Sequence, residues 1–232
     1  MARTDTEPLP TGQEKVDAVR SMFDAIAPRY DLVNRVMTFR MDVGWRKRTI
    51  ADLRLPQSST VLDLACGTGD LCRGLADAGL RPVGMDVSFG MLAAARTDVP
   101  LSQADALRLP VPDASVDGVT CGFALRNFVE LAPFFVELGR VVRPGGRIAL
   151  LEVAEPANPV LRWGHGIYFG KVVPRIGGLL SDASAYQYLP RSVAYLPEPD
   201  AMLAMLAEAG FEQVNRQLLS TGIAQLITAT RA

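Results

Sequence analysis

The feature that constrains the fold most is a short apolar run that ends in a glycine-rich turn. Residues 60–66 read Thr-Val-Leu-Asp-Leu-Ala-Cys, and Gly67-Thr68-Gly69 follows directly. Helical spacing resumes at once with Leu71, Leu75 and Ala78, which is typical of a buried strand that leads into a helix through a tight loop. Because glycine allows close approach of the backbone, we expect a ligand to lie against this loop.

The residues around the glycines indicate which ligand the loop suits. A dinucleotide-binding fingerprint has a third small residue three positions after the second glycine, and Cys72 stands there instead. Carboxylates at Asp63 and Asp70 flank the loop. Two acids would repel a pyrophosphate but suit a ligand that carries an ammonium and a sulfonium. The loop therefore favours S-adenosylmethionine (SAM) over NAD.

Composition limits the classes of protein to consider. A chain of 232 residues with 49% hydrophobic and 21% charged residues is long enough for one well-buried α/β domain. A net charge of −1 gives no long-range attraction for nucleic acid. The three cysteines, Cys66, Cys72 and Cys121, have no metal-ligand spacing and suit a reducing cytoplasm as buried thiols. No run of about 18 apolar residues predicts a membrane span.

The N-terminal part predicts a helical cap. Residues 1–12 are expected to form a flexible tail and residues 13–232 a single domain, whose cap covers 13–55. From Gln13, a helical stripe of apolar residues leaves Lys15 on the polar side. Tyr30 and Asp31 fall between helices, where they line a pocket or simply face solvent. Residues 46–48, Arg-Lys-Arg, are interpreted as a solvated helix face, with contact to lipid headgroups as the alternative.

Four further strands and their connecting helices complete the predicted parallel sheet. Strands are expected at 82–86, 99–103, 116–123 and 147–153, with helices at 70–78, 89–96 and 129–142 between them. In open α/β sheets, ligands bind beyond the carboxyl ends of the strands, and an acid about 20 residues after the loop holds ribose hydroxyls. Asp86 fits that place. Asp105 and Ala106 could hydrogen-bond the adenine amino group and admit its ring, or form an ordinary turn.

The last third of the chain interrupts this alternation. Residues 155–199 form an insertion rich in aromatic residues and glycine, expected to serve as a lid or substrate wall, or as a structural cap of the core. A helix at 201–209 and two strands near 211–219 and 222–230 follow. The predicted fold is α/β: a doubly wound, mostly parallel, seven-stranded Rossmann-like sheet with one antiparallel strand.

Several blocks together resemble class I SAM-dependent methyltransferases, and more closely the family that C-methylates precursors of menaquinone and ubiquinone. The resemblance covers nearly the whole chain from about Lys15. It is carried by Tyr30-Asp31-Leu32-Val33-Asn34 with Trp45-Arg46, Leu62 to Asp70, Gly122 to Asn127, Arg143 to Gly146, Leu151-Glu152, and Tyr186 to Leu189 with Ser192. The Phe-x-Leu-Arg-Asn and Tyr-x-Tyr-Leu blocks are the most particular.

The resemblance implies SAM as cofactor, S-adenosylhomocysteine as its product, and a prenylated quinol, most closely demethylmenaquinol, as substrate. We expect no metal, no nucleic acid partner, peripheral contact with the inner face of the cell membrane, and a homodimer. Predicted cofactor contacts are Asp63, Gly67, Thr68, Gly69, Asp86, Val87, Asp105, Ala106 and Gly122. Predicted substrate contacts are Tyr30, Phe123, Arg126, Asn127 and Tyr188, of which Arg126 and Asn127 are the catalytic candidates.

Two departures from the family pattern keep alternatives open. Gly122 stands where the family often has serine, and Asp42 where it often has histidine. With His165 as the single histidine, a histidine base is not expected. A methyltransferase of a soluble aromatic or polyketide-like metabolite, an NAD-dependent reductase, and a SAM-binding subunit without catalysis are the rival interpretations.

Overall fold

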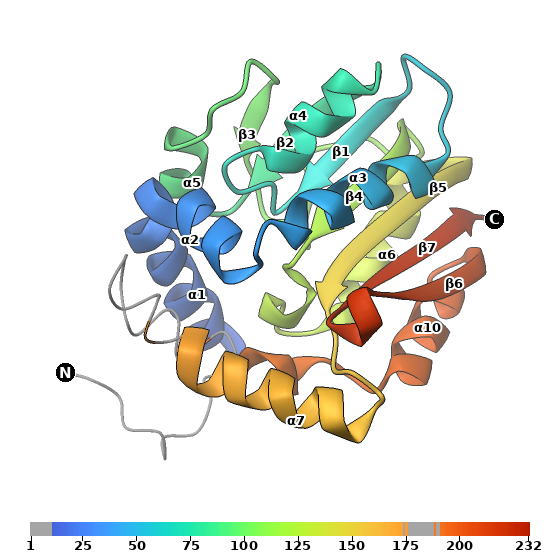
Figure 1. The fold of residues 1–232 in the computed structure, drawn as a ribbon. Helices are drawn as coiled ribbons and strands as arrows, with labels where there is room; N and C mark the ends of the chain where they lie inside the picture. Colours follow the sequence, from blue (N-terminus) through green and yellow to red (C-terminus); the bar gives the residue numbers. More distant parts are fainter. Residues whose placement is uncertain (1–10, 174, 176–187, 189–190) are drawn as a thin grey trace.

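The fold is a twisted seven-stranded sheet between two layers of helices (Figure 1). The computed structural model describes residues 11–173, 175, 188 and 191–232. The strand order is β3-β2-β1-β4-β5-β7-β6, and only β7 runs antiparallel to its neighbours. The strands are β1 (Thr60–Leu64), β2 (Arg81–Asp86), β3 (Leu101–Gln103), β4 (Val116–Gly122), β5 (Val142–Val153), β6 (Phe211–Leu219) and β7 (Ala224–Arg231). The predicted fold class is confirmed.

Helices connect the strands and cap one end of the sheet. In the described part of the chain, the α-helices are α1 (Gly12–Ile26), α2 (Tyr30–Met37), α3 (Met41–Leu53), α4 (Asp70–Asp77), α5 (Phe89–Ala93), α6 (Leu131–Val141), α7 (Pro159–Ile167) and α10 (Pro199–Glu208). Short helical turns are η1 (Ala27–Arg29), η2 (Leu125–Asn127), η3 (Tyr168–Val172), η4 (Val193–Tyr195) and η5 (Ser220–Gly222).

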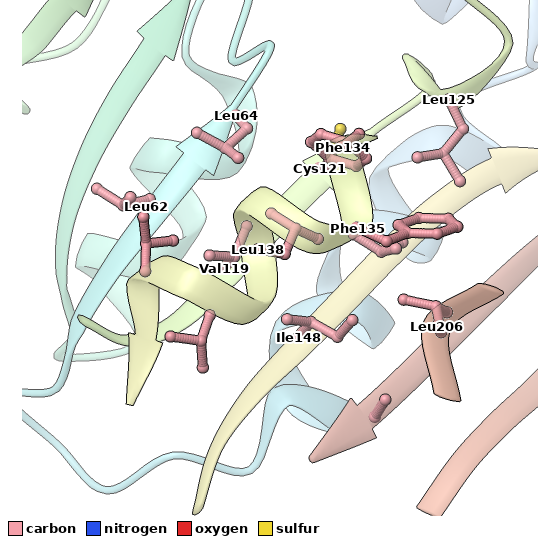
Figure 2. Packing of buried hydrophobic residues seen from close by; sticks show 14 of the residues in the cluster. Leu62, Leu64, Val119, Cys121, Leu125, Phe134, Phe135, Leu138, Ile148 and Leu206 are labelled. Atoms are coloured by element: carbon pink, nitrogen blue, oxygen red, sulfur yellow. The ribbon is translucent and has the colours of Figure 1, made fainter. Parts of the chain in front are cut away.

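Alternation along the central strands explains why helices cover both faces. Successive side chains of a strand point to opposite faces. Leu62 and Leu64 of β1 therefore belong to the core cluster on one face of the sheet, which also contains Phe135 and Leu138 of α6, shown against the strands in Figure 2. Val61 points the other way and packs with Leu53 of α3 and Leu75 of α4. Because both faces are covered, the strands are apolar on both sides, as in other parallel sheets.

Two predicted boundaries are wrong by more than two residues, and Tyr30 and Asp31, which were expected between helices, are the first residues of α2. The helix expected at 89–96 ends at Ala93, because the backbone of Arg96 is drawn to the glycine-rich loop: its N–H donates to Thr68 O at 3.4 Å and its carbonyl accepts from Arg73 at 2.9 Å. β5 begins at Val142 rather than at 147, since Val142 already pairs with Val116 of β4 across an irregularity in the register. Residues 143–146, which lie between the predicted helix and the predicted strand, are therefore part of β5.

The N-terminal helices lie over the carboxyl ends of β1, β2 and β4 (Figure 1). Ile26 and Ala27 pack against Val33 and Met37 of α2, and Val173, which follows η3, joins the same cluster. On α3, four residues at helical spacing are buried: Asp42, Trp45, Thr49 and Leu53. This layer stands where residues 13–55 were expected to form a cap. Residues 1–10, which hold most of the expected tail, lie outside the described residues.

Lys15 of α1 is buried, although the helical pattern places it on the polar side. Its Nζ donates to the carbonyl oxygen of Phe128 at 2.5 Å and lies 3.5 Å from the centroid of the Tyr195 ring. Burial lowers the pKa of Lys15 to about 8. The lysine therefore ties α1 to two segments that are distant in sequence, through a charge-assisted hydrogen bond and a cation–π contact.

The lowered pKa gives a pH dependence of stability. The pKa of a lysine is about 10.4 in an unfolded chain, so between pH 8 and 10.4 the unfolded state binds more protons and folding is favoured as pH rises. Relative to Lys15→Met, we expect the free energy of unfolding of the wild type to rise over this range. Denaturant unfolding of both proteins at several pH values measures this difference, and parallel curves would contradict it.

Candidate functional site

An apolar cavity opens at the carboxyl ends of β1, β2 and β4, where open α/β sheets bind their ligands. It has a volume of about 940 Å³, including the part open to solvent. One wall comes from α1, through Val16, Val19 and Phe23. The remaining lining residues include Tyr30, Ala65, Gly67, Asp86, Val87, Met91, Ala104, Asp105, Ala106, Leu107, Gly122, Phe123, Ala124, Asn127, Phe128 and Val129. We call this the first cavity.

Asp86 joins the glycine-rich loop to the end of β2. Its Oδ2 accepts from the backbone N–H of Gly67 at 2.8 Å, and its Oδ1 accepts from the N–H of Ser88 at 2.8 Å. The residue is only 8% exposed, and burial raises its pKa. Two of roughly four acceptor positions of the carboxylate are used. The remaining lone pairs are available to hydroxyl groups of a ligand in the first cavity.

The backbone of the glycine-rich loop adopts left-handed geometry at Gly67 (φ 56°) and Gly69 (φ 83°), which favours glycine. Gly67 lines the first cavity, whereas Gly69 lines none of the cavities of the site and begins helix α4. The Thr68 hydroxyl donates to Asp31 Oδ1 at 2.5 Å and faces a smaller adjoining cavity beside Asp63. This contact fixes α2 against the loop.

Asp63 is fully buried beneath the loop. It accepts from the Thr120 hydroxyl at 2.8 Å and from the Cys72 thiol at 3.3 Å. Burial raises the pKa of Asp63 to about 7. Near neutral pH its carboxyl group is therefore only partly ionised, in contrast to the full negative charge that the sequence argument assumed.

Asp70, the second acid beside the loop, is surrounded by guanidinium groups. Arg73 pairs with it, Arg35 lies 3.4 Å away and Arg46 lies 3.7 Å away, each measured from nitrogen to carboxylate oxygen. The expected pair of free negative charges is thus wrong in its physical detail, because one acid is compensated and the other partly protonated. Among the acids that line the first cavity itself are Asp86 and Asp105.

Small and apolar residues form the end of the first cavity away from the loop. Asp105 follows β3, and its Oδ1 accepts from the N–H of Leu107 at 2.9 Å. Ala104, Ala106 and Leu107 line the cavity beside it. These side chains leave room for a flat ring, and Asp105 keeps further acceptor sites for an amino group.

A second cavity of about 750 Å³ adjoins the first, and both are lined by Phe23, Tyr30 and Phe123. Its other walls come from α1, α2, α3 and the ends of β5 and β7: Met22, Ile26, Asn34, Met37, Thr38, Asp42, Trp45, Arg46, Arg126, Val153 and Ile223. Tyr30 also lines the small cavity beside Asp63. Burial raises the pKa of the Tyr30 hydroxyl, while Arg46 and Arg126 oppose that shift.

Arg126 lines the second cavity and is 5% exposed. Its guanidinium pairs with buried Glu152 at the end of β5, and its Nη1 also donates to the Phe123 carbonyl at 2.8 Å. Nε donates to the Ser192 hydroxyl at 3.2 Å. The next residue, Asn127, lines the first cavity and accepts from the Tyr188 hydroxyl at 3.3 Å.

Arg46 is a site residue that the sequence interpretation missed. Its pattern predicts a solvated helix face, but its side chain is 14% exposed, pairs with Asp42 and lines the second cavity. The guanidinium carbon lies 5.7 Å from the centroid of the Phe123 ring. The i,i+4 spacing of Asp42 and Arg46 is the signal that could have found this pair.

The insertion reaches the site through residues near its end. Tyr188 and Ser192 contact Asn127 and Arg126, and Tyr195 covers Lys15. Tyr186, which belongs to the Tyr-x-Tyr-Leu block, lies outside the described residues. Among the residues described, no group of three or more His, Cys, Asp and Glu side chains is placed to hold a metal ion. Nor does any helix in the described ranges have the length and hydropathy to cross a membrane.

Solved methyltransferases share this architecture. Haemonchus contortus phosphoethanolamine N-methyltransferase 2, solved with S-adenosylhomocysteine, superposes with a TM-score of 0.64 at 13% identity, covering 96% of this chain and 60% of that one. A SAM-dependent methyltransferase from Aquifex aeolicus gives 0.57 at 17% identity, covering 81% and 89%. At these identities the likeness concerns the fold.

Sequence comparisons are more specific. A demethylmenaquinone methyltransferase of Thermus thermophilus is 43% identical over 221 residues, which cover 90% of this chain and 100% of the relative. A demethylmenaquinone methyltransferase of Deinococcus radiodurans is 41% identical over 234 residues, with 97% of each chain covered. Residues 11–231 match the ubiE/COQ5 methyltransferase family. The chain therefore belongs to the ubiE/COQ5 methyltransferase family and is a SAM-dependent methyltransferase.

Proposed function

We propose that this enzyme methylates a ring carbon of a prenylated quinol, with demethylmenaquinol as substrate and menaquinol as product. The observation that carries the proposal is the pair of adjoining cavities, one suited to SAM and one with mainly apolar walls, which share Tyr30 and Phe123. The names of the relatives support the choice of quinol. An NAD-dependent reductase is not proposed, since the family is one of methyltransferases.

The first cavity fits SAM by the chemistry of its lining. We propose that Asp86 accepts from the ribose hydroxyls, that Val87 and Ala106 enclose the adenine ring, and that Asp105 accepts from its amino group. Gly67 and Gly122 would face the methionine part with backbone groups, near Thr68 and Asp63, and Gly69 would act by shaping the loop. When bound, SAM supplies an electrophilic methyl group on a positively charged sulfur.

The second cavity offers what a quinol ring needs. A hydroquinone is an electron-rich carbon nucleophile, and loss of a phenolic proton activates it further. We propose that Phe123 and Tyr30 hold the ring and that Arg126 stabilises the phenolate oxygen, either directly or through water. Asn127, positioned by Tyr188, would orient the other ring oxygen. Holding the reacting carbon in line can lower a barrier by roughly 7–11 kcal/mol.

The proposed step needs no residue as nucleophile. The ring carbon forms the new C–C bond while the bond between the methyl carbon and the donor sulfur breaks, with its electron pair staying on sulfur. The proton on that ring carbon then passes to solvent, which restores aromaticity. Phe123, Trp45 and Met22 keep water from the ring. A dry site favours transfer because charge is lost from the sulfonium as the bond forms.

Product analysis tests the proposal. The purified enzyme is incubated with SAM and a reduced, short-chain demethylmenaquinol, and the product is analysed by mass spectrometry. The expected result is one added methyl group on the ring carbon. Turnover of soluble phenols or polyketide-like aromatics in place of the quinol would contradict the substrate, and binding of SAM without turnover on any of them would contradict the activity.

We further propose that the enzyme works in the cytoplasm at the inner face of the cell membrane, because a prenylated quinol resides in the bilayer. The odd number of cysteines supports a reducing compartment, and all three are buried free thiols. The homodimer and the absence of a metal or nucleic acid partner stay predictions. Sedimentation and metal analysis of the purified protein address them.

A further inference from the structure

Exposed apolar side chains are concentrated on one face of the molecule. Eight of the twelve large hydrophobic side chains that are exposed in the described part of the chain belong to α2, the turn that follows it, α7 or η3. They are Leu32, Val36, Phe39, Val160, Leu161, Trp163, Ile167 and Val172. We call this set the apolar face. The most exposed of these side chains are Val160, at 75%, and Phe39 and Trp163, at 71% each.

The two halves of the apolar face adjoin. The Tyr168 hydroxyl, just after α7, donates to the Met37 carbonyl at 2.7 Å, and the Tyr168 ring centroid lies 5.6 Å from that of Phe39. Figure 1 shows α7 crossing below the carboxyl ends of the strands toward α1 and α2. The face therefore covers the same edge of the molecule at which the cavities open.

Helix α7 is amphipathic with its apolar stripe turned outward. Val160, Trp163 and Ile167 recur at three- and four-residue spacing, which places them on one side. None of the residues of α7 is buried. The Arg162 side chain is not part of this stripe, and it donates to the backbone carbonyls of Pro156 and Ala157. Burial in the protein core thus does not account for this stripe.

Helix α2 has one side toward the second cavity and another side toward solvent. Asn34 and Met37 line the second cavity, whereas Leu32 and Val36 face outward at 56% and 41% exposure. One helix layer therefore separates the proposed quinol cavity from the apolar face. An apolar tail that leaves this cavity past α2 would emerge at the face.

The charged residues near the apolar face indicate what kind of surface it binds. The sequence has no acidic residue between Glu155 and Asp182, and the described part of this stretch contains Arg162 and Arg175. The net charge of the whole chain is −1, so this excess of positive charge is local. An apolar stripe with a tryptophan and nearby cations matches an anionic lipid surface. A nine-residue helix is too short to span a bilayer and suits an interfacial position.

We infer that the apolar face docks the enzyme on an anionic phospholipid bilayer, with Trp163 and Val160 inserted at the level of the headgroups. The inference deepens the proposed function, since it provides the route by which a prenylated quinol passes from bilayer to cavity. Both halves of the face take part, and the cations strengthen binding without being sufficient for it.

The test uses the full chain and vesicles of mixed phosphatidylcholine and phosphatidylglycerol. We expect the wild type to co-sediment with these vesicles, and the double variant Val160→Ser/Trp163→Ser to bind at least about tenfold more weakly. The matched control is Val136→Ser, a 61% exposed valine on α6, which should bind as the wild type does. High salt should weaken wild-type binding without abolishing it.

Fluorescence and turnover separate this inference from the proposed function. Trp45 is 6% exposed, so a blue shift of emission on adding vesicles reports on Trp163. The double variant should keep its turnover of a short-chain quinol in solution and lose it for a long-chain quinol in vesicles. Equal vesicle binding by variant and wild type would overturn the inference. So would a wild-type dimer that the variant converts to monomer without any vesicle binding. Absence of turnover on short-chain quinol would instead contradict the proposed function.

Discussion

Glu152→Gln is expected to destabilise the protein by about 3–5 kcal/mol, since it leaves the buried guanidinium of Arg126 without its counter-charge. Glutamine keeps the shape of the side chain, but its amino group faces an N–H donor in either orientation, because one Glu152 oxygen accepts from the Arg126 N–H at 3.2 Å and the other from the Val153 N–H at 2.8 Å. The expected loss therefore combines the missing counter-charge with one broken hydrogen bond. For a chain of this size, the melting temperature should fall by roughly 10 °C. Thermal unfolding followed by circular dichroism measures the shift.

Two further variants make the result interpretable. Asp52→Asn removes the partner of Arg48 from a more exposed ion pair, in which the arginine side chain is 49% exposed, and should cost at most about 1 kcal/mol. The double variant Arg126→Gln/Glu152→Gln contains no buried charge at this place and should recover most of the stability lost in Glu152→Gln. It should remain impaired in turnover if Arg126 stabilises the phenolate. A wild-type melting temperature for Glu152→Gln would refute the argument.

Asp86→Asn is expected to weaken SAM binding by about 100-fold. The carboxylate accepts from two backbone N–H groups at 2.8 Å each, and an asparagine in its place turns an amino group toward one of them. One of the proposed hydrogen bonds to the ribose hydroxyls is lost as well. One hydrogen bond to a charged group contributes roughly 1.5–3 kcal/mol, and the upper part of this range corresponds to a 100-fold change in affinity, because asparagine still offers one acceptor oxygen to the ribose.

Isothermal titration with SAM and with S-adenosylhomocysteine measures the change. Asp113→Asn is the control, because its side chain is 78% exposed and pairs with Arg140 far from the first cavity. It should bind both ligands as the wild type does. A dissociation constant of Asp86→Asn within about threefold of the wild type would remove Asp86 from the proposed ribose site.

The sheet was predictable because its signals are local. Alternating apolar residues such as Leu62 and Leu64, followed by the glycine-rich turn, specify a strand and a loop without reference to the rest of the chain. The parallel arrangement follows from the alternation of strands and helices, whereas the strand order was not predicted and comes from the structure. Boundaries were less certain: the early end of α5 depends on Arg73, which lies in another helix.

The electrostatics of the site could not be predicted in the same way. Asp70 is an acid in the sequence, but three arginines from different helices surround it in space. Asp63 is an acid whose burial raises its pKa to about 7. SAM was correctly inferred as the cofactor, but the negative charge of these two residues, which was given as the reason, is largely reduced in the folded protein. Charge in a folded site depends on neighbours that no local pattern reveals.

Buried polar residues far apart in sequence were missed for a similar reason. Lys15 reads as part of a solvated face, and only the position of Tyr195 and of the Phe128 carbonyl explains its burial. Glu152 was noticed as part of a family block, but its partner Arg126 lies 26 residues earlier. Such pairs need tertiary structure to bring them together.

The direction of β7 has a practical consequence for experiments on the protein. Because β7 runs opposite to its neighbours, its C-terminal residue Arg231 lies at the end of the sheet opposite the cavities (Figure 1). The Arg231 guanidinium donates there to the carbonyls of Gly139 and Gly210. An affinity tag or a fluorescent label joined after Ala232 would project from that far edge. Attachment there leaves the enzyme free to meet both ligands, whereas additions next to α1 crowd the helix that walls the first cavity.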